Sequence, residues 1–335
     1  MSEPLVLVDG DVLGRRRTGD ETYIRQLLGA LPAVADGLRI GAIVRDATLA
    51  PEGVEAFVLP ARSQELRMAV GAPRLLRRVR PALAHFVHSL PLHCPAPAVL
   101  TVQDLSWERD PSVFGRWDLV TFKLFVRTSV RRARHVFAIS ERTKRDLVEV
   151  YGTPEAKITV TPLAPDAAFR PASEHDSFLL FVSAIEPRKQ PLAAVDAANA
   201  VGRKLVVVGP AKDAELAAEL RRRGADVRGY VPKEELVRLY QTAACLVFPS
   251  RYEGFGLPVV EAMACGTPVV AAPEPALQEV AGDAAIFSDD LAEGVRRALA
   301  ERERLSAAGL QRVKAFSWSE TARATADVYR KLLAA

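Results

Sequence analysis

The most informative part of this chain is the stretch Ser250-Arg-Tyr-Glu-Gly-Phe-Gly-Leu-Pro-Val-Val-Glu-Ala-Met-Ala-Cys-Gly-Thr-Pro-Val-Val270. The apolar run before it, Ala244–Phe248, has the length and residue content of a buried strand. Gly254 and Gly256 permit a tight turn, and Pro258 suits the first turn of a helix that we expect to end near Cys265. This strand–turn–helix order is typical of a parallel α/β domain.

Two carboxylates bracket this turn. Glu253 lies in the loop and Glu261 lies one turn into the helix, so both can face one ligand above the carboxyl end of the strand. The helix N-terminus also offers unpaired N–H groups to a phosphate at the same place. The alternative is an ordinary loop acid and a solvated helix acid. The two glycines and the proline favour a ligand site.

Length and composition predict two domains in a soluble, cytoplasmic protein. The 335 residues fit two cores, and 49% of them are hydrophobic. The N-terminal segment has an acid, Glu3, where a signal peptide needs positive charge, and no apolar run approaches the length of a membrane span. Three cysteines, an odd number, indicate reduced thiols rather than a disulfide framework.

Charge is unevenly distributed along the chain. Residues 1–165 carry 23 Lys and Arg against 18 Asp and Glu, whereas residues 166–335 carry 22 against 23. Arginine clusters in the first half could meet an anionic partner such as lipid headgroups, which would give peripheral membrane contact. Solvated helix faces are the alternative, and no nucleic-acid recognition motif accompanies the clusters. The clusters are Arg15–Arg17, Arg74/Arg77/Arg78/Arg80 and Arg127/Arg131/Arg132/Arg134.

Strand-like runs alternate with helix-like stretches along the whole chain, which predicts doubly wound parallel sheets. We expect an N-terminal domain over residues 1–163, a Pro-rich linker over 164–177, a second domain over 178–316 and a final helix over 317–335 that packs back toward the N-terminal domain. The expected strands of the first half are Leu5–Val8, Ile40–Val44, Ala56–Leu59, Leu83–Val87, Ala98–Val102, His135–Ile139 and Ile158–Val160. Its expected helices are Thr22–Leu31, Gln64–Arg78, Trp117–Arg132 and Glu141–Tyr151, the last capped by Ser140.

A basic pair follows the first strand of the second domain. Arg188 and Lys189 come after the run Phe178–Val182. Gly209 occupies the corresponding position at the end of the next strand. Carboxyl ends of parallel strands share one sheet edge, so the pair should lie at the same edge as Glu253. There it could stabilise a diphosphate leaving group without a metal. A basic surface turn is the alternative.

These motifs, in this order, resemble the retaining nucleotide-sugar glycosyltransferases of the GT4 group, which have the GT-B architecture of two facing Rossmann-like domains with a cleft between them. The Glu253–Glu261 segment is similar to that family's E-x7-E motif, and Glu-Pro-Arg188-Lys189 is similar to its donor-phosphate loop. Gly229-Tyr-Val-Pro-Lys-Glu-Glu-Leu resembles the segment that contacts the nucleobase. Weaker resemblance continues through Arg17–Tyr23, Thr101–Ser106 and Ala138–Lys144.

The resemblance implies a role for each matching residue. Glu253 would bind hydroxyls of the transferred sugar, Glu261 the nucleotide ribose, and Arg188 with Lys189 the diphosphate. Gly19 would bring the first loop near that diphosphate, and Glu279 with Val280 would border the donor pocket. The other donor-binding residues expected are Gly254, Phe255, Gly256, Leu257, Gly209, Tyr230 and Val231.

The sequence departs from the family pattern in the first half. The family's frequent His-Asp pair is Gln103-Asp104 here, and Asp20 follows Gly19 where a second glycine is common. In the second half, Ser183 stands near a strand end where many relatives have an arginine. The phosphate clamp would then rest on Arg188 and Lys189 alone.

Two residues after strands of the first domain are candidates for the acceptor side. His88 follows Leu83–Val87, and Asp104 follows Ala98–Val102, although an Asp there is commonly a turn residue. A metal site formed by His85, His88, His93 and Cys94 is disfavoured, because no second ligand pair follows at a usual spacing. We therefore predict no metal and no cofactor.

The sequence as a whole predicts a retaining, metal-independent glycosyltransferase. It would move a hexose-type sugar from a nucleotide-diphosphate sugar to a glycan, lipid-linked or small-molecule acceptor. A nucleotide-sugar epimerase or hydrolase on the same fold is one alternative, because fold does not fix chemistry. A non-catalytic nucleotide-sugar-binding protein is the other, because Gln103 and Ser183 depart from the family.

Overall fold

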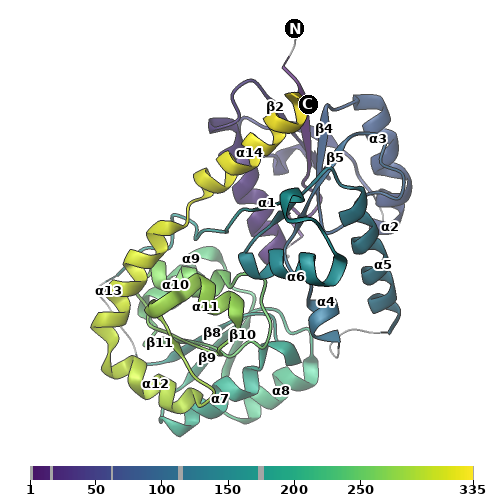
Figure 1. Ribbon diagram of the computed structural model, residues 1–335. Helices are drawn as coiled ribbons and strands as arrows, with labels where there is room; N and C mark the ends of the chain where they lie inside the picture. Colours follow the sequence, from purple (N-terminus) through teal and green to yellow (C-terminus); the bar gives the residue numbers. More distant parts are fainter. Residues whose placement is uncertain (1–2, 16–17, 62, 112–115, 173–176, 335) are drawn as a thin grey trace. The chain divides into compact units, whose positions relative to one another are not determined.

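A computed structural model of the chain describes residues 3–15, 18–61, 63–111, 116–172 and 177–334. Contacts divide the chain into two units (Figure 1). Unit 1 comprises Met1–Glu108, Gly115–Leu163 and Ser317–Ala335, and unit 2 comprises Arg109–Phe114 and Ala164–Phe316. Each unit holds one parallel sheet covered by helices, so the predicted α/β class with two Rossmann-like domains is confirmed.

Unit 1 is built on a seven-stranded sheet with the order β3-β2-β1-β4-β5-β6-β7. The strand order reverses between β1 and β4, which makes that point the switch point at which doubly wound sheets bind ligands. The strands are β1 (Leu5–Asp9), β2 (Arg39–Val44), β3 (Glu55–Val58), β4 (Leu83–Val87), β5 (Ala98–Val102), β6 (His135–Ala138) and β7 (Ile158–Val160). The helices are α1 (Thr18–Ala30), α2 (Gln64–Leu66), α3 (Ala72–Val79), α4 (Ser106–Arg109), α5 (Arg116–Arg132), α6 (Glu141–Tyr151) and α14 (Trp318–Ala334).

Two helix predictions in unit 1 were wrong in their bounds. Helix α1 begins at Thr18 instead of Thr22, so Gly19 lies in its first turn and not in a preceding loop. Asp20 and Glu21 stabilise that early start, because acids favour the N-terminal end of a helix. The predicted Gln64–Arg78 helix is interrupted by a π-helical turn at Arg67–Gly71, just before Pro73, which has no N–H to donate.

The final helix α14 packs within unit 1. Tyr329 is fully buried and its hydroxyl pairs with Nδ1 of His85 in β4, while the other ring nitrogen of His85 lies 2.7 Å from Oγ1 of Thr101 in β5. The Trp318 ring lies 6.4 Å from the Tyr23 ring of α1. A buried polar network therefore attaches the last helix to the centre of this sheet, and it uses His85 as a structural residue.

Unit 2 has a six-stranded parallel sheet with the order β10-β9-β8-β11-β12-β13, which reverses between β8 and β11. The strands are β8 (Leu179–Val182), β9 (Leu205–Val208), β10 (Asp226–Gly229), β11 (Cys245–Phe248), β12 (Val269–Ala271) and β13 (Ile286–Phe287). The helices are α7 (Pro191–Ala200), α8 (Ala214–Arg222), α9 (Lys233–Thr242), α10 (Leu257–Ala264), α11 (Pro275–Ala281), α12 (Leu291–Ala300) and α13 (Arg302–Arg312). Successive strand residues enter two separate apolar clusters, one on each face of the sheet.

The segment predicted as a linker belongs to unit 2 in its described part, 164–172 and 177. Phe169 is buried in the unit 2 core, where its ring meets the Tyr240 ring at 5.5 Å, and Asp166 pairs with Lys233 at 2.5 Å. Residues 173–176 of the predicted linker lie outside the described residues. Phe169 and Asp166 therefore attach this connection to unit 2, although Pro171 in it is exposed.

Two further expectations concern cysteines and membrane spans. All three cysteines, Cys94, Cys245 and Cys265, are free thiols, as predicted. In the part of the chain that the structure describes, no helix has both the length and the apolar character needed to cross a bilayer.

Candidate functional site

The two loops that carry the predicted donor residues leave neighbouring strands at the switch point of unit 2. One loop follows β8 and ends in a single 3-10 turn, Pro187–Lys189, and the other follows β11 and leads into α10. Their backbones join where the Arg251 N–H donates to the Arg188 carbonyl at 3.1 Å. The fold therefore brings the basic pair and the Glu253 turn together.

Lys189 and Glu253 form an ion pair at this position. Lys189 Nζ lies 2.5 Å from Glu253 Oε1, and the two residues are each only 8% exposed. The ammonium also lies 5.9 Å from the centre of the Phe248 ring, within the range of a cation–π contact. Burial lowers the pKa of Lys189, although the Glu253 charge opposes that shift. The alternative of a solvated basic turn does not describe this lysine.

Arg188 ties the two loops together through its guanidinium. Its Nη1 donates to the Tyr252 carbonyl at 2.6 Å and its Nη2 donates to Glu186 Oε1 at 2.8 Å. The other oxygen of Glu186 accepts from Lys212 Nζ at 2.9 Å. Burial alone would raise the pKa of Glu186, but the Lys212 hydrogen bond and the Arg188 charge outweigh burial and lower it. Three cations and two carboxylates thus share this edge of the sheet.

Sequence reasoning missed Glu186 and Lys212 as members of this cluster. Lys212 follows β9, so it lies at the same sheet edge as Lys189. Its place after a predicted strand could have indicated that it belongs to the cluster. Glu186 stands two residues before Arg188 and could have been expected to pair with it.

The turn after Glu253 is shaped by glycine. Gly256 has φ +102° and forms the N-cap of α10, and a Cβ there would lie 2.6 Å from a methyl carbon of Leu277. Helix α10 begins at Leu257 and ends at Ala264, one residue earlier at each end than predicted. The Phe255 ring is buried against the Phe316 ring at 5.5 Å. Gly254 is buried, and Leu257 is half-buried.

Glu261 lies in the second half of α10 and accepts a hydrogen bond from the Tyr240 hydroxyl at 2.8 Å. Burial raises its pKa to about 7, and the Tyr240 hydrogen bond partly opposes that rise. The carboxyl group is therefore poised to change charge near neutral pH. Such a shifted carboxyl is a common feature of ligand sites, although structural networks also produce it.

The other predicted donor residues occupy varied positions in unit 2. Gly209 has φ +139°, and a Cβ there would lie 2.0 Å from the Ser183 carbonyl oxygen, so this glycine permits close approach of two backbones. Tyr230 is exposed after β10, whereas Val231 is part of the core. On α11, the carbonyls of Glu279 and Val280 both accept from Arg312. Their roles toward a donor remain predictions.

In unit 1, His88 directly follows β4 in a left-handed conformation with φ +63°, which is unusual for a residue with a side chain. Its Nε2 lies 3.4 Å from Oδ1 of Asp20 in α1, and its Nδ1 is buried without a hydrogen-bond partner. Burial alone would lower the pKa of His88, but Asp20 and Asp104 outweigh burial and raise it.

Gln103 lies beside this histidine at the end of the neighbouring strand β5. It is 8% exposed, and its Nε2 is a buried donor without a partner. Its Oε1 lies 3.9 Å from the position that a Cβ would take at Gly19, so the side chain borders the first turn of α1. Asp104 accepts from the Ser106 N–H at 2.8 Å, which is the turn role given above as its alternative. Two unsatisfied polar atoms therefore gather at the switch point of unit 1.

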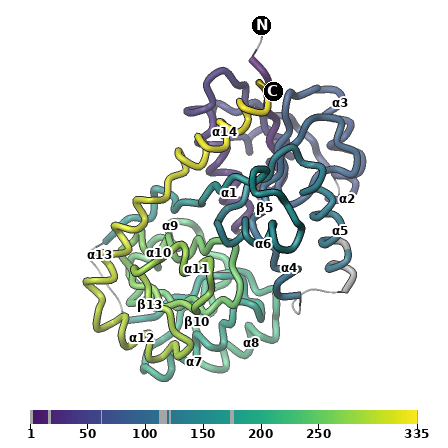
Figure 2. Tube along the Cα trace, in the orientation of Figure 1, coloured from purple at the N-terminus to yellow at the C-terminus, as the bar shows by residue number. Residues whose placement is uncertain are grey.

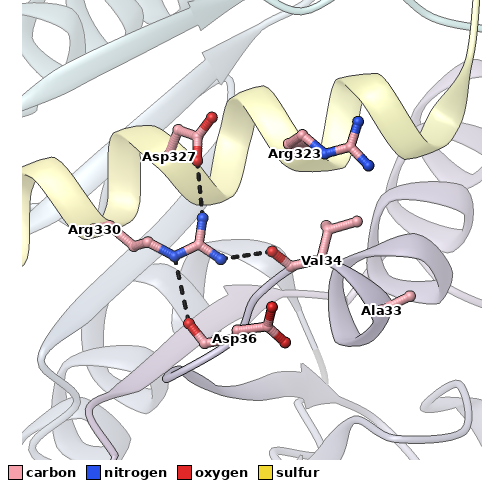
Figure 3. A pocket seen from close by; sticks show the side chains of 6 residues that line it. All are labelled: Ala33, Val34, Asp36, Arg323, Asp327 and Arg330. Atoms are coloured by element: carbon pink, nitrogen blue, oxygen red, sulfur yellow. Dashed lines mark hydrogen bonds and ion pairs between the residues drawn. The ribbon is translucent and has the colours of Figure 1, made fainter.

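A polar cavity of about 460 Å³ lies elsewhere in unit 1 (Figure 3). Arg330 of α14 crosses it and bonds to Asp327 and to the Val34 and Asp36 carbonyls. Because Val34 and Asp36 precede β2, the cavity lies at the amino end of the strands, opposite the edge that carries His88. Arg330 attaches α14 to the loop before β2, and this structural role accounts for the arginine without a ligand.

Within the described ranges, no group of three or more His, Cys, Asp or Glu side chains is arranged to hold a metal ion. His85, one of the four residues considered for such a site, is instead bonded to Tyr329 and Thr101.

Comparison with known proteins identifies the family. A model described as Glycosyl transferases group 1 matches residues 166–311, and one described as Glycosyltransferase Family 4 matches residues 18–169. A relative from Catenulispora acidiphila, D-inositol 3-phosphate glycosyltransferase 2, is 30% identical, with 93% of this chain and 85% of the relative covered. The chain is a group 1 glycosyltransferase. The family predicted from the motifs is thereby confirmed.

Other relatives of this group 1 glycosyltransferase differ in how much of their length is matched. O-antigen chain mannosyltransferase B of Escherichia coli is 28% identical, with 70% of each chain covered. For a D-inositol 3-phosphate glycosyltransferase of Nocardioides, which is 33% identical over 60% of this chain, the match spans only about half of the relative, 54%.

Solved structures confirm the GT-B fold class. Sucrose-phosphate synthase from Thermosynechococcus elongatus has a TM-score of 0.79 at 20% identity, with 99% of both chains covered. An Anabaena protein solved in complex with UDP-glucose has a TM-score of 0.76 at 15% identity, with 98% of this chain and 100% of that chain covered. At these identities the likeness concerns the fold alone.

Proposed function

We propose that this chain is a retaining, metal-independent hexosyltransferase that uses a nucleotide-diphosphate sugar as its donor. The observation that carries the proposal is the buried Lys189–Glu253 pair at the switch point of unit 2. An ammonium and a carboxylate removed from water are expensive to bury, so their retention at a ligand-binding edge favours a functional use.

The donor would rearrange this pair. Its diphosphate carries more negative charge than Glu253 and would draw Lys189 Nζ toward the phosphate oxygens. Glu253, released from the lysine, would then accept hydrogen bonds from hydroxyls of the sugar. Arg188 holds both loops in position through Tyr252 and Glu186 and adds positive charge nearby. Glu261, further along α10, would accept from the ribose hydroxyls in its ionised form.

Catalysis would come from positioning and charge stabilisation. The acceptor hydroxyl approaches the anomeric carbon on the face from which the diphosphate leaves, which retains the configuration. Its oxygen forms a bond to that carbon as the bond from the carbon to the phosphate oxygen breaks, and the leaving diphosphate takes up both the electron pair and the hydroxyl proton. Lys189 and the Arg188 charge stabilise that developing negative charge. No covalent sugar–enzyme intermediate is needed, and no metal or other cofactor enters these steps.

Unit 1 would hold the acceptor at His88 and Gln103. In the neutral form of His88 that donates from Nε2 to Asp20, Nδ1 has a lone pair that can accept a hydrogen bond from a hydroxyl, and in the protonated form, which the raised pKa favours, Nδ1 donates to the hydroxyl oxygen instead. Gln103 Nε2 has N–H groups that can donate to a hydroxyl oxygen. A sugar hydroxyl both donates and accepts, so this pair of unsatisfied atoms matches it.

The relatives support a sugar donor of this kind. One is named as a mannosyltransferase, others as inositol-phosphate glycosyltransferases, and a structure with the same fold contains UDP-glucose. Mannose and glucose, the two sugars that these names contain, are both hexoses. The proposal therefore names the hexose class and no single sugar.

A panel of UDP-, GDP-, ADP- and dTDP-hexoses tests the proposal. We expect one member to raise the melting temperature of the wild-type protein and to be hydrolysed slowly without acceptor, with the hydrolysis lost in Glu253→Ala. EDTA should leave that hydrolysis unchanged. Stabilisation by no member would contradict the donor assignment, and an EDTA loss restored by a divalent metal would contradict metal independence. An epimerised sugar in place of hydrolysis would select the epimerase alternative.

A further inference from the structure

Helix α5 of unit 1 carries a stripe of exposed side chains at helical spacing. The stripe consists of Val120, Leu124, Arg127 and Arg131, at positions i, i+4, i+7 and i+11, which fall on one side of a helix. Val120 is 60% exposed and Leu124 is 62% exposed, and both arginines are exposed. The opposite side of α5 is buried through Val126 and Val130 and needs no further partner.

A second stripe with the same design lies on the segment that contains α2 and α3. Leu66 is 60% exposed and Val70 is 37% exposed, and exposed Arg74 and Arg77 follow them. In both stripes the large apolar residues come first and the arginines come last.

The two stripes lie on the same face of the unit 1 sheet. The α2–α3 segment connects β3 to β4, and α5 connects β5 to β6, so both crossovers move in the same direction along the strand order. Parallel crossovers are almost always right-handed, which places both on one face. Figure 2 shows α2, α3 and α5 along one side of unit 1. Because both helices run from the carboxyl to the amino edge, their apolar ends lie near the same edge.

The loop after β4 adds one more exposed apolar residue to this face. Leu92 is 62% exposed. Its neighbours fix the loop against α5, because the Leu90 N–H donates to Ser129 Oγ at 2.9 Å and Arg132 Nη1 donates to the Pro91 carbonyl at 3.1 Å. The loop that carries Leu92 is therefore held against the last turns of α5.

The charge of this face is mainly positive. Residues 118–134 contain Lys123 and four arginines against one acid, Asp118, and residues 65–80 contain five arginines against one acid, Glu65. Lys123 is paired with Glu108 at 3.0 Å, which leaves the arginines as the main source of the charge. Of the five arginines in residues 65–80, Arg67 is buried and paired with Asp9, which leaves the others for the surface. A second copy of the chain would present the same positive charge and be repelled, so the complementary partner is anionic.

We propose that this face docks on an anionic lipid bilayer as a peripheral contact. The exposed valines and leucines would enter the interface between headgroups and acyl chains, and the arginines would bind lipid phosphates. A nucleic acid would match the arginines but would leave the apolar residues in water. The apolar ends lie toward the strand edge that carries His88 and Gln103. If the proposed acceptor role of those residues holds, a lipid-linked acceptor would reach them from the bilayer surface.

Sedimentation with phosphatidylcholine vesicles, prepared with and without phosphatidylglycerol, tests the docking face directly. We expect binding to the anionic vesicles that weakens with salt and little binding to the neutral ones. Arg127→Gln/Arg131→Gln should lower the apparent partition coefficient by about twenty-five-fold, because each arginine near the surface contributes about a fivefold factor. Val120→Ser/Leu124→Ser should lower it without changing the net charge.

Arg221→Gln/Arg222→Gln is the matched control. It makes the same charge change on exposed residues of α8 in unit 2 and should bind vesicles as the wild type does. Equal loss in this control would overturn the proposal, because net charge alone would then explain binding. Unchanged binding in both α5 variants, with melting temperatures as in the wild type, would also overturn it. So would a concentration-dependent dimer that Val120→Ser/Leu124→Ser abolishes, because a second copy would then be the occupant.

Discussion

Lys189 and Glu253 neutralise each other in a place that, on the proposed function, receives a diphosphate. A buried ion pair contributes little net stability, because the cost of removing both charges from water offsets their attraction. We therefore interpret the pair as a preformed arrangement in which a ligand diphosphate can replace Glu253 as the partner of Lys189. Sequence reasoning placed both residues at one sheet edge but could not show that they pair, because the contact depends on how two loops 64 residues apart are joined.

Glu261 gives the first prediction at the residue scale. Its pKa rises from 4.5 to about 7 on folding, so the folded protein binds this proton more tightly than the unfolded chain does. The stability associated with that proton is present below pH 4.5 and is lost as the pH rises through 7. Glu261→Gln, which removes the titration, should therefore unfold at a higher denaturant concentration than the wild type at pH 8. We expect about 1–2 kcal/mol, after allowance for the partial exposure of the group.

The same substitution should weaken donor binding, because an amide is a poorer acceptor for ribose hydroxyls than a carboxylate. The comparison requires unfolding curves for both proteins from pH 4 to pH 8, and the stability difference should disappear at the acid end. A difference that is independent of pH would show that Glu261 does not titrate in this range.

At the scale of elements, the loop after β8 depends on the backbone of β9. Gly209 lies so close to the Ser183 carbonyl that a side chain there has no space, and its φ of +139° is rarely adopted by other residues. Gly209→Ala should cost about 3–5 kcal/mol in the free energy of unfolding, from backbone strain together with overpacking.

Gly202→Ala is the matched control for this clash. Gly202 has φ +66°, and no atom lies within 4 Å of the position that a Cβ would take there, so only the left-handed strain of about 1 kcal/mol remains. Both values come from denaturant unfolding followed by circular dichroism. Equal losses of unfolding free energy in the two variants would contradict this prediction, because the loop that contains Ser183 would then accommodate the added methyl group with no further destabilisation.

The elements that could be predicted from sequence are those with local signals. Helix α6 has a serine cap that binds the Thr143 N–H, and its predicted bounds hold at both ends. Strand β13 was not predicted, because its two residues are too few to show any alternation. The predicted start of α1 was wrong because Gly19, expected in the preceding loop, lies in the first turn of the helix.

At the scale of the molecule, the chain returns to its first unit in its last residues. Tyr329 of α14 bonds to His85, and burial lowers the pKa of that histidine to about 3, so its ring is neutral. Neither residue could be assigned this role from sequence, because the two are 244 positions apart.

Tyr329→Phe tests this attachment. It leaves His85 Nδ1 buried without its partner, and we expect a loss of about 1–3 kcal/mol in unit 1. Hydrogen exchange should accelerate in α14, β4 and β5, while the amides of β8, β9 and β11 keep wild-type rates. Uniform acceleration over both units would contradict a role confined to unit 1.

The donor site as a whole was predicted in location and residue type, while its internal contacts were not. Glu186 and Lys212 joined it only through the structure, and Arg188 proved to brace two loops. In unit 1, Gln103 was noted as a departure from the family, but only folding showed its amide to be buried and unsatisfied. Long-range geometry of this kind cannot be obtained from local sequence patterns.

The most direct measurement is the affinity of the nucleoside diphosphate of the best donor for three proteins by titration calorimetry. If Lys189 binds the diphosphate and Glu253 competes for it, Lys189→Met should weaken binding by about tenfold or more, as expected for the loss of a charge-assisted hydrogen bond. Glu253→Gln, by contrast, should bind the diphosphate at least as tightly as the wild type and yet lose sugar hydrolysis. Wild-type affinity in a folded Lys189→Met protein would contradict the account.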